Sequence, residues 1–199
     1  MKFFVKTACF IFLFITILLF NTETFGKNTK IKYSKDNISN YFFGIISINQ
    51  NHTTTGFKYL KKVEFLKNSH SNFNTQFIRT LILLEKFEQA FVYSKSVWRE
   101  SEIFFVIDLL LGLESFIDKD YESSEKHFKR LNKTYSHTSF YENFLGNILL
   151  SWNEASKKNK EASFKYLDKI PKRYTHLKQI QNSFLNCYFD TSQARIAFE

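Results

Sequence analysis

The chain contains very little cysteine, proline or glycine. Of its 199 residues, two are cysteine, one is proline and five are glycine. Cys9 lies in the N-terminal segment, so Cys187 has no second cysteine in the rest of the chain with which to form a disulfide. We expect Cys187 to be buried as a small apolar residue. The lack of a cysteine pair also excludes a structural zinc site built on one.

Patterns that carry catalysis are missing as well. The glycines are isolated from one another and form no glycine-rich loop that could hold phosphate. No two histidines have the spacing of a zinc-binding helix motif, and serine, histidine and aspartate occur without a nucleophile elbow. The histidines are His52, His70, His127, His137 and His176. The sequence therefore predicts a protein that is not an enzyme and has no catalytic residue, metal site or cofactor.

The N-terminus has the pattern of an export signal. Two lysines, Lys2 and Lys6, precede an apolar run from Ala8 to Phe20, and small residues follow up to Gly26. A largely apolar run of 13 residues suits a cleaved secretory signal, since a membrane-spanning helix needs roughly 20. We predict a signal peptide over residues 1–26 and a flexible leader over 27–36. The alternative is an inner-membrane anchor formed by residues 7–20.

The chain is basic, with 28 Lys and Arg against 19 Asp and Glu and a net charge of +9. Loss of residues 1–26 removes two lysines and one glutamate, which leaves a charge of +8. Much of this charge is expected on the solvated polar sides of helices or in turns, at Lys58, Lys61, Lys62, Lys126, Lys129, Arg130, Lys157, Lys158, Lys160 and Lys165. In an exported protein, this positive charge would encounter anionic lipid or envelope polymers rather than nucleic acid. We expect no nucleic-acid partner.

A repeat of 34 residues organises most of the chain. Gly44, Gly112 and Gly146 lie on one 34-residue grid, and Ile78 occupies the point between the first two. When each glycine is counted as position eight, position seven is always large and apolar: Phe43, Phe77, Leu111 and Leu145. Position twenty is always small: Gly56, Ala90 and Ser124. A fixed period of this length indicates a helical repeat protein.

This layout resembles the tetratricopeptide repeat family over roughly residues 37 to 170. The residues that carry the resemblance are the small eighth and twentieth positions and the aromatics Phe87 and Tyr121 that open second helices. The resemblance implies an all-α fold, a right-handed α-solenoid of antiparallel helix pairs. The chain departs from the family at position four, where Asn40, Asn74, Asp108 and Glu142 replace an aromatic, and at Asn68, Glu102 and Ser136, where the closing proline is missing. An unrelated helical bundle with coincidental spacing is the alternative.

We predict a repeat domain over residues 37–199, with at least seven helices and no sheet. The repeats cover 37–70, 71–104, 105–138 and 139–173, and an incomplete fifth covers 174–199. Small residues are needed where two helices cross closely, because each extra methylene would push the axes apart. The predicted small positions are Gly44, Gly56, Ala90, Gly112, Ser124 and Gly146.

The fourth repeat interrupts the grid. The apolar residues of its second helix lie about five positions later than the 34-residue grid predicts, which indicates an insertion around Trp152 to Asn159. Pro171 ends that second helix. The fifth repeat stops at an apolar pattern that ends with Phe198. A solenoid needs a polar outer face on its last helix, so we expect additional repeats in a longer chain.

In the family that this chain resembles, the inner, concave face of the first helices binds protein partners. Carried onto this chain, the resemblance implies a partner-binding face that includes Tyr41, Ile45, Ile48, Arg79, Leu83, Leu109, Leu113, Phe116, Asn143 and Asn147. The face lacks the lysines and arginines of the family's carboxylate clamp, so apolar anchors would supply the binding energy. Alternatively, tight curvature or another segment of the chain buries this face.

The function predicted from these features is that of an exported bacterial scaffold, periplasmic or envelope-associated, which binds a protein or peptide partner. The alternative is an envelope-anchoring protein that binds anionic polymer or lipid through its basic surface.

Overall fold

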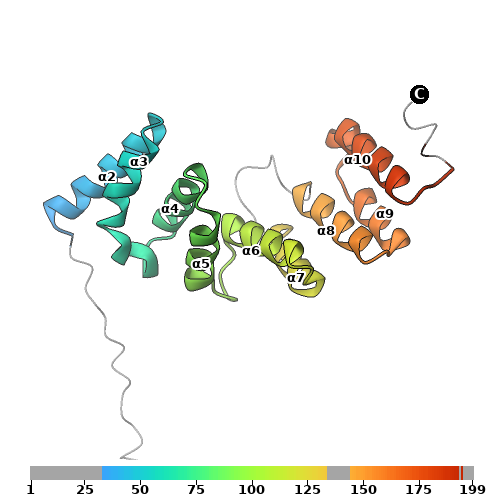
Figure 1. Cartoon of the computed structure of the whole chain (residues 1–199), viewed down its shortest axis with the longest axis horizontal. Helices are drawn as coiled ribbons and strands as arrows, with labels where there is room; N and C mark the ends of the chain where they lie inside the picture. The colour runs from blue at the N-terminus through green and yellow to red at the C-terminus, as the bar shows by residue number, and fades with distance from the viewer. Residues whose placement is uncertain (1–32, 134–143, 193, 195–199) are drawn as a thin grey trace, which may run out of the picture. The chain divides into compact units, whose positions relative to one another are not determined.

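The chain folds as a succession of helices. The computed structural model describes residues 33–133, 144–192 and 194, and within these it contains nine α-helices, two short 3₁₀ helices and no strand (Figure 1). The elements are α2 (Lys35–Asn49), α3 (Thr53–Lys61), η1 (Glu64–Asn68), α4 (Ser71–Leu83), α5 (Phe87–Val97), α6 (Phe105–Ile117), α7 (Tyr121–Leu131), α8 (Leu145–Ser156), α9 (Lys160–Asp168), η2 (Lys172–Tyr174) and α10 (Thr175–Tyr188). For this part of the chain, the predicted all-α fold is confirmed.

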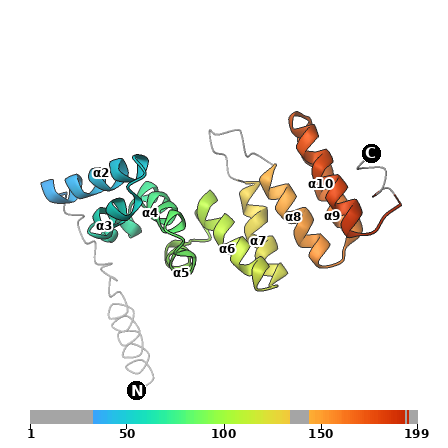
Figure 2. The ribbon, with the colours of Figure 1, turned by 45° about the horizontal axis from the view of Figure 1, so that its top comes forward.

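Each helix packs against its neighbour in the sequence. The hairpins are α2 with α3, α4 with α5, α6 with α7, and α8 with α9, and α10 then packs on α9 (Figure 2). Successive hairpins are also in contact, through α3 with α4, α5 with α6, and α7 with α8. One helix pair cannot bury its own apolar face, so stacking of pairs completes the core. This is the packing of an α-solenoid.

All five first helices end in the same turn. The second residue after each helix has a left-handed backbone, with φ of 63° at Asn51, 58° at Glu85, 63° at Lys119, 63° at Lys158 and 47° at Asp190. The next N–H donates to a carbonyl five residues back, for example Asp120 to Ser115 over 2.9 Å and Thr191 to Asn186 over 3.0 Å. This pair of features defines a Schellman turn. The turn residues therefore give the true repeat spacings, which are 34, 34, 39 and 32.

Small residues lie where the two helices of a pair cross. A side chain at Gly44 would place its Cβ 2.6 Å from Leu60 Cδ2, and one at Gly112 would lie 2.5 Å from Phe128 Cε1. The Oγ of Ser124 donates to the Gly112 carbonyl over 3.0 Å, which shows how closely α6 and α7 approach. Gly56 and Ala90 are also buried at their crossings.

The fourth pair uses serine at its crossing instead of glycine. Ser151 and Ser163 exchange hydrogen bonds, each hydroxyl donating to the other residue's carbonyl over 2.8 and 2.7 Å. They are twelve residues apart, as are Gly112 and Ser124. Position eight of this pair is therefore Ser151, five residues later than the grid places it.

Gly146 has a different role from the one that the grid assigns to it. It lies near the start of α8 and faces the Asn132 side chain at the end of α7, where a Cβ would overlap the amide group. The glycine thus permits close contact with the preceding pair. The extra residues fall between α7 and α8 and not around Trp152 to Asn159, so the predicted place of the insertion is wrong. Gly146 and Ser151 are both small enough to fit a helix crossing. The 34-residue grid selected Gly146, and the insertion was therefore placed after it.

Candidate interaction surface

The surface that the family resemblance points to can now be located in the structure. We call it the first-helix face and define it as positions two, five, nine, twelve and thirteen of each first helix, counted from the left-handed turns. Arg79 and Leu83 of α4 are exposed on it. Partly exposed side chains complete the predicted set on α2 and α6: Tyr41, Ile45, Leu109, Leu113 and Phe116. These residues can be reached by a partner.

Three predicted residues are not available in this way. Ile48 is only 2 % exposed, because it packs under α3 where a Cβ on Gly56 would lie 2.5 Å from its Cγ1. Asn147 is 3 % exposed and accepts a hydrogen bond from Asn132 Nδ2 over 3.1 Å. Asn143 lies outside the described residues. We leave all three out of the surface proposed below.

The shifted register brings other residues of α8 to the first-helix face. Ile148 and Trp152 occupy positions five and nine, and both are partly exposed. The indole Nε1 of Trp152 donates to Gln181 Oε1 over 2.8 Å, and its ring lies edge-on to Tyr188 at 5.8 Å. These contacts join α8 to α10 on this face.

Helix α10 presents the most exposed apolar stripe on the first-helix face. Leu177 is 46 % exposed, Ile180 48 %, Phe184 46 % and Tyr188 44 %. Their spacing of three and four residues places them on one side of the helix, while Leu185 and Asn186 are buried on the side that faces the core. The predicted site did not include this stripe, because the family positions were carried onto the first four repeats and the fifth was treated as incomplete. The spacing of apolar residues within α10 was the signal that could have found it.

Polar residues at position four of the second, third and fourth pairs are buried beneath this face. Asn74 accepts a hydrogen bond from Tyr93 Oη over 2.7 Å and donates to the Lys67 carbonyl over 2.9 Å. Burial raises the pKa of Tyr93, and the negative charge of Glu64 raises it further. The corresponding residues of the next two pairs are Asp108 and Asn147. The family's aromatic at this position is thus replaced by a polar link between first and second helices.

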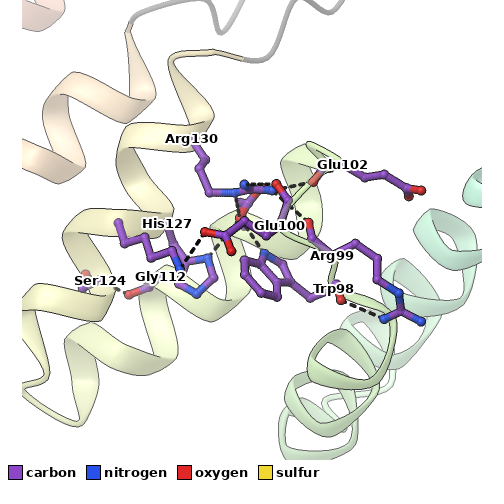
Figure 3. Close-up of polar contacts among 10 residues, drawn as sticks. Trp98, Arg99, Glu100, Glu102, Gly112, Ser124, His127 and Arg130 are labelled. Atoms are coloured by element: carbon purple, nitrogen blue, oxygen red, sulfur yellow. Dashed lines mark hydrogen bonds and ion pairs between the residues drawn. The ribbon is translucent and has the colours of Figure 1, made fainter. Parts of the chain in front are cut away.

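The position-four residue of α6 is the centre of a buried charge cluster (Figure 3). The side chain of Asp108 is fully buried, and its Oδ1 accepts hydrogen bonds from Trp98 Nε1 at 3.1 Å and Arg130 Nε at 2.8 Å. Nδ1 of His127 lies 3.0 Å from the same oxygen and must carry the proton, since a carboxylate only accepts. Burial raises the pKa of Asp108, but the hydrogen bonds from His127, Arg130 and Trp98 outweigh it and the net pKa is lowered.

Arg130 also holds the connection that leads into α6. Its Nη1 donates to the Glu100 carbonyl over 2.8 Å, and its Nη2 donates to the carbonyls of Arg99 and Glu102 (Figure 3). The guanidinium lies 5.3 Å from the centre of the Trp98 ring. One arginine therefore ties α7, α6 and the preceding connection together. The sequence placed Arg130 on a solvated surface, and this is wrong: its side chain is 11 % exposed.

The Asp108 cluster has the character of a structural junction. All three donors bind Oδ1, while Oδ2 is buried and has no hydrogen-bond partner among the described residues. The side chain is fully buried, so neither oxygen is exposed to a substrate in solution. Among the described residues, no group of three or more His, Cys, Asp or Glu side chains is arranged to hold a metal ion.

Several lysines of the predicted basic surface are paired with carboxylates. Nζ of Lys129 lies 2.6 Å from Glu125 Oε1, and Nζ of Lys157 lies 2.9 Å from Glu125 Oε2. Lys126 pairs with Glu100 at 3.2 Å. These ion pairs reduce the positive electrostatic potential with which the lysines could attract an anionic partner.

Two further expectations can be checked in the structure. Cys187 is exposed on α10, so the predicted burial of its thiol is wrong. No helix within the described ranges is long and apolar enough to cross a membrane. The N-terminal run from Ala8 to Phe20 lies outside those ranges.

Comparisons with known proteins support the fold. The solved structure described as "MamA RS-1 ArsTM double mutant", a protein of tetratricopeptide type, matches with a TM-score of 0.64 and 12 % sequence identity. The match covers 83 % of this chain and 92 % of that one. No protein-family model matches the chain, and no curated protein matches it in sequence. At 12 % identity, the likeness shows a shared tetratricopeptide-like fold and nothing about partners.

Proposed function

We propose that the protein is an interaction scaffold that binds an apolar helix or peptide of another protein along its first-helix face. The observation that carries this proposal is the exposed stripe on α10, formed by Leu177, Ile180, Phe184 and Tyr188. Exposed apolar residues gathered on one helix side mark interaction surfaces, whereas single scattered ones need no explanation.

The composition of the face suits a partner held by a few large anchors. Trp152 and Tyr188 supply aromatic rings, and aromatic anchors dominate the energy of many protein interfaces. Leu83 and Ile117 extend the exposed apolar surface to α4 and α6. Gln181, held by the Trp152 indole, places a polar side chain beside the stripe that can orient the partner.

Export is the second part of the proposal. The charged start, the apolar run from Ala8 to Phe20 and the small residues up to Gly26 support a cleaved signal peptide. The scaffold would then act in the periplasm or on the envelope of a bacterium. An anchor formed by residues 7–20 would place the same face beside the inner membrane.

Site-specific photocrosslinking tests the scaffold function. A photoreactive phenylalanine analogue in place of Phe184 should form adducts of discrete mass with a protein in cells, while the same analogue in place of the exposed Glu122 on α7 should not. The change Ile180→Lys on the same stripe should suppress the adduct, since it introduces charge into the apolar contact. Equal adducts from both positions, or adducts only with the chain itself, would count against the proposal.

The rival function is binding of anionic envelope polymer or lipid through the basic surface. The ion pairs of Lys126, Lys129 and Lys157 weigh against it, because these lysines are already partly neutralised. Salt separates the two functions, since contacts between exposed charges are screened and apolar contacts are not. Retention on envelope material that disappears between about 0.1 and 0.5 M salt would favour the rival.

A further inference from the structure

A separate pocket lies on the second-helix side of the first two pairs. It has a volume of about 410 Å³ and lies between α3, α4 and α5. Its apolar lining includes Phe57, Phe77, Leu81, Val92 and Tyr93, with Ser96 at one side. The Phe57 and Phe77 rings are stacked with their centres 5.8 Å apart, and Tyr93 lies 4.7 Å from Phe77. The pocket is thus lined by three packed aromatic rings.

The pocket coincides with a break in the pattern of second-helix lysines. Position twenty-two is lysine in the other three pairs, at Lys58, Lys126 and Lys165, but in α5 it is Val92. Position twenty-six is likewise cationic in the other pairs, at Lys62, Arg130 and Lys169, but in α5 it is Ser96. Val92 is 67 % exposed, so an apolar side chain faces solvent where its counterparts are charged.

In two of the other pairs, the cation of position twenty-six lies over a tyrosine ring. In the first pair, Nζ of Lys62 lies 5.0 Å from the centre of the Tyr59 ring, and in the fourth pair Nζ of Lys169 lies 4.4 Å from the Tyr166 ring. Tyr93 is the equivalent ring in α5. The short Ser96 side chain donates to the Tyr93 carbonyl over 2.7 Å and places no charge beside this ring. Tyr93 is itself only 6 % exposed, so Val92 is the exposed apolar side chain of the pocket.

The charged residues at the pocket have a small positive excess. The lining includes Lys61 and Lys67 against Glu64 and Glu88, and Lys86 lies beside the Phe57 ring, which leaves one net positive charge. Nζ of Lys86 lies 5.1 Å from the Phe57 ring, and Lys67 lines the pocket. Neither has a carboxylate within ion-pair distance among the described residues, whereas Lys61 at the rim pairs with Glu64 at 2.6 Å. Glu88 adds one negative charge to the rim.

We propose that this pocket is a second docking site, which takes a large apolar side chain from an acidic segment of a partner protein. The aromatic rings and Val92 supply the apolar contact, and the unpaired ammonium groups of Lys67 and Lys86 meet carboxylates that flank the anchor. The site lies on α3, α4 and α5 and does not depend on the first-helix face.

The test uses the full chain, labelled with ¹⁵N, and the acetylated and amidated hexapeptide Glu-Glu-Leu-Phe-Glu-Glu as the probe. Saturable shifts are expected at the amides of Phe57, Val92 and Ser96. Val92→Lys restores the lysine of the other pairs and should weaken binding about tenfold, because it removes the apolar contact. Thr54→Lys, on the exposed start of α3, adds the same charge outside the pocket and should leave the affinity unchanged.

Two matched peptides distinguish the contribution of the apolar side chains to binding from that of the carboxylates. Replacing Leu-Phe by Ser-Ser should abolish saturable binding, and replacing the glutamates by glutamines should weaken it several-fold. The proposal is overturned if the Ser-Ser peptide binds equally well, if Val92→Lys binds as tightly or more tightly, or if no saturation is reached at about 5 mM peptide. Binding to phosphatidylglycerol vesicles that is lost in Val92→Lys, with no peptide binding, would assign the pocket to a membrane surface and would also overturn it.

Discussion

Nε of Arg130 donates a hydrogen bond to Oδ1 of Asp108 over 2.8 Å, and both side chains are shielded from solvent. The two residues are on different helices of one pair, and Arg130 also binds the carbonyls of the connection before α6. This ion pair therefore links the third pair to the connection that follows the second pair.

The first prediction concerns that ion pair. Asp108→Ala should lower the free energy of unfolding by about 3 kcal/mol, because it leaves the buried guanidinium of Arg130 without its carboxylate. Urea denaturation followed by circular dichroism measures the change. Asp118→Ala removes an exposed carboxylate at the end of the same helix and should cost less than about 0.5 kcal/mol. Equal effects of the two variants would show that the junction does not need the pair.

The second prediction is the pH dependence that follows from the lowered pKa of Asp108. A carboxylate with a lower pKa in the folded state adds stability above its unfolded pKa and loses it as the pH falls through the folded value. The unfolded pKa is about 3.9, so this contribution should be complete above about pH 5 and decline below about pH 4. Asp108→Asn should flatten that part of the stability profile. A variant with the same acid profile as the parent would refute this assignment.

The third prediction tests the close crossing of α6 and α7. Gly112→Leu should destabilise the protein by about 1 to 3 kcal/mol, since its Cβ would lie 2.5 Å from Phe128 Cε1. Leucine has a helix propensity about 0.8 kcal/mol more favourable than glycine. A loss of stability would therefore come from the steric overlap and not from helix propensity. Thermal unfolding is a suitable measurement. A variant as stable as the parent would mean that the helices can separate at little cost.

The fourth prediction uses the left-handed turns. Lys119→Gly should stabilise the protein by about 0.5 kcal/mol, because φ at this residue is 63° and glycine adopts it without steric cost. Part of the gain is offset by the greater freedom of glycine in the unfolded chain. Lys129→Gly, in the last turn of α7, provides the comparison and should destabilise the protein by about 1 kcal/mol, because glycine disfavours the helix and the ion pair with Glu125 is lost. Destabilisation by both changes would argue against the assigned turn.

The fifth prediction concerns export. If residues 1–26 are a cleaved signal, the mature protein should begin near Lys27 and be found in the periplasm. Mass spectrometry of cell fractions identifies the N-terminus. Intact Met1 in the membrane fraction would support the anchor, and a product found only in the cytoplasm would contradict both alternatives.

Much of the fold follows from short-range patterns. The small residues Gly44, Gly112 and Ser124 recur at fixed spacing because two helices can cross closely only there, so the period predicted the helix pairs from the sequence. The same logic failed in the fourth pair, where Gly146 and Ser151 are both small enough to fit a crossing. Only packing against Asn132 and Ser163 distinguishes their roles.

The sequence by itself determined the all-helical class and the pairing of helices, since these depend on apolar periodicity and side-chain size. The tertiary structure alone decided the Asp108 cluster, because Trp98, His127 and Arg130 come from three separate segments whose approach no local pattern records. It also decided which predicted surface residues are buried, as with Ile48, and which apolar stripe remains open on α10. Burial depends on what packs against a residue, and neighbours distant in sequence supply that packing.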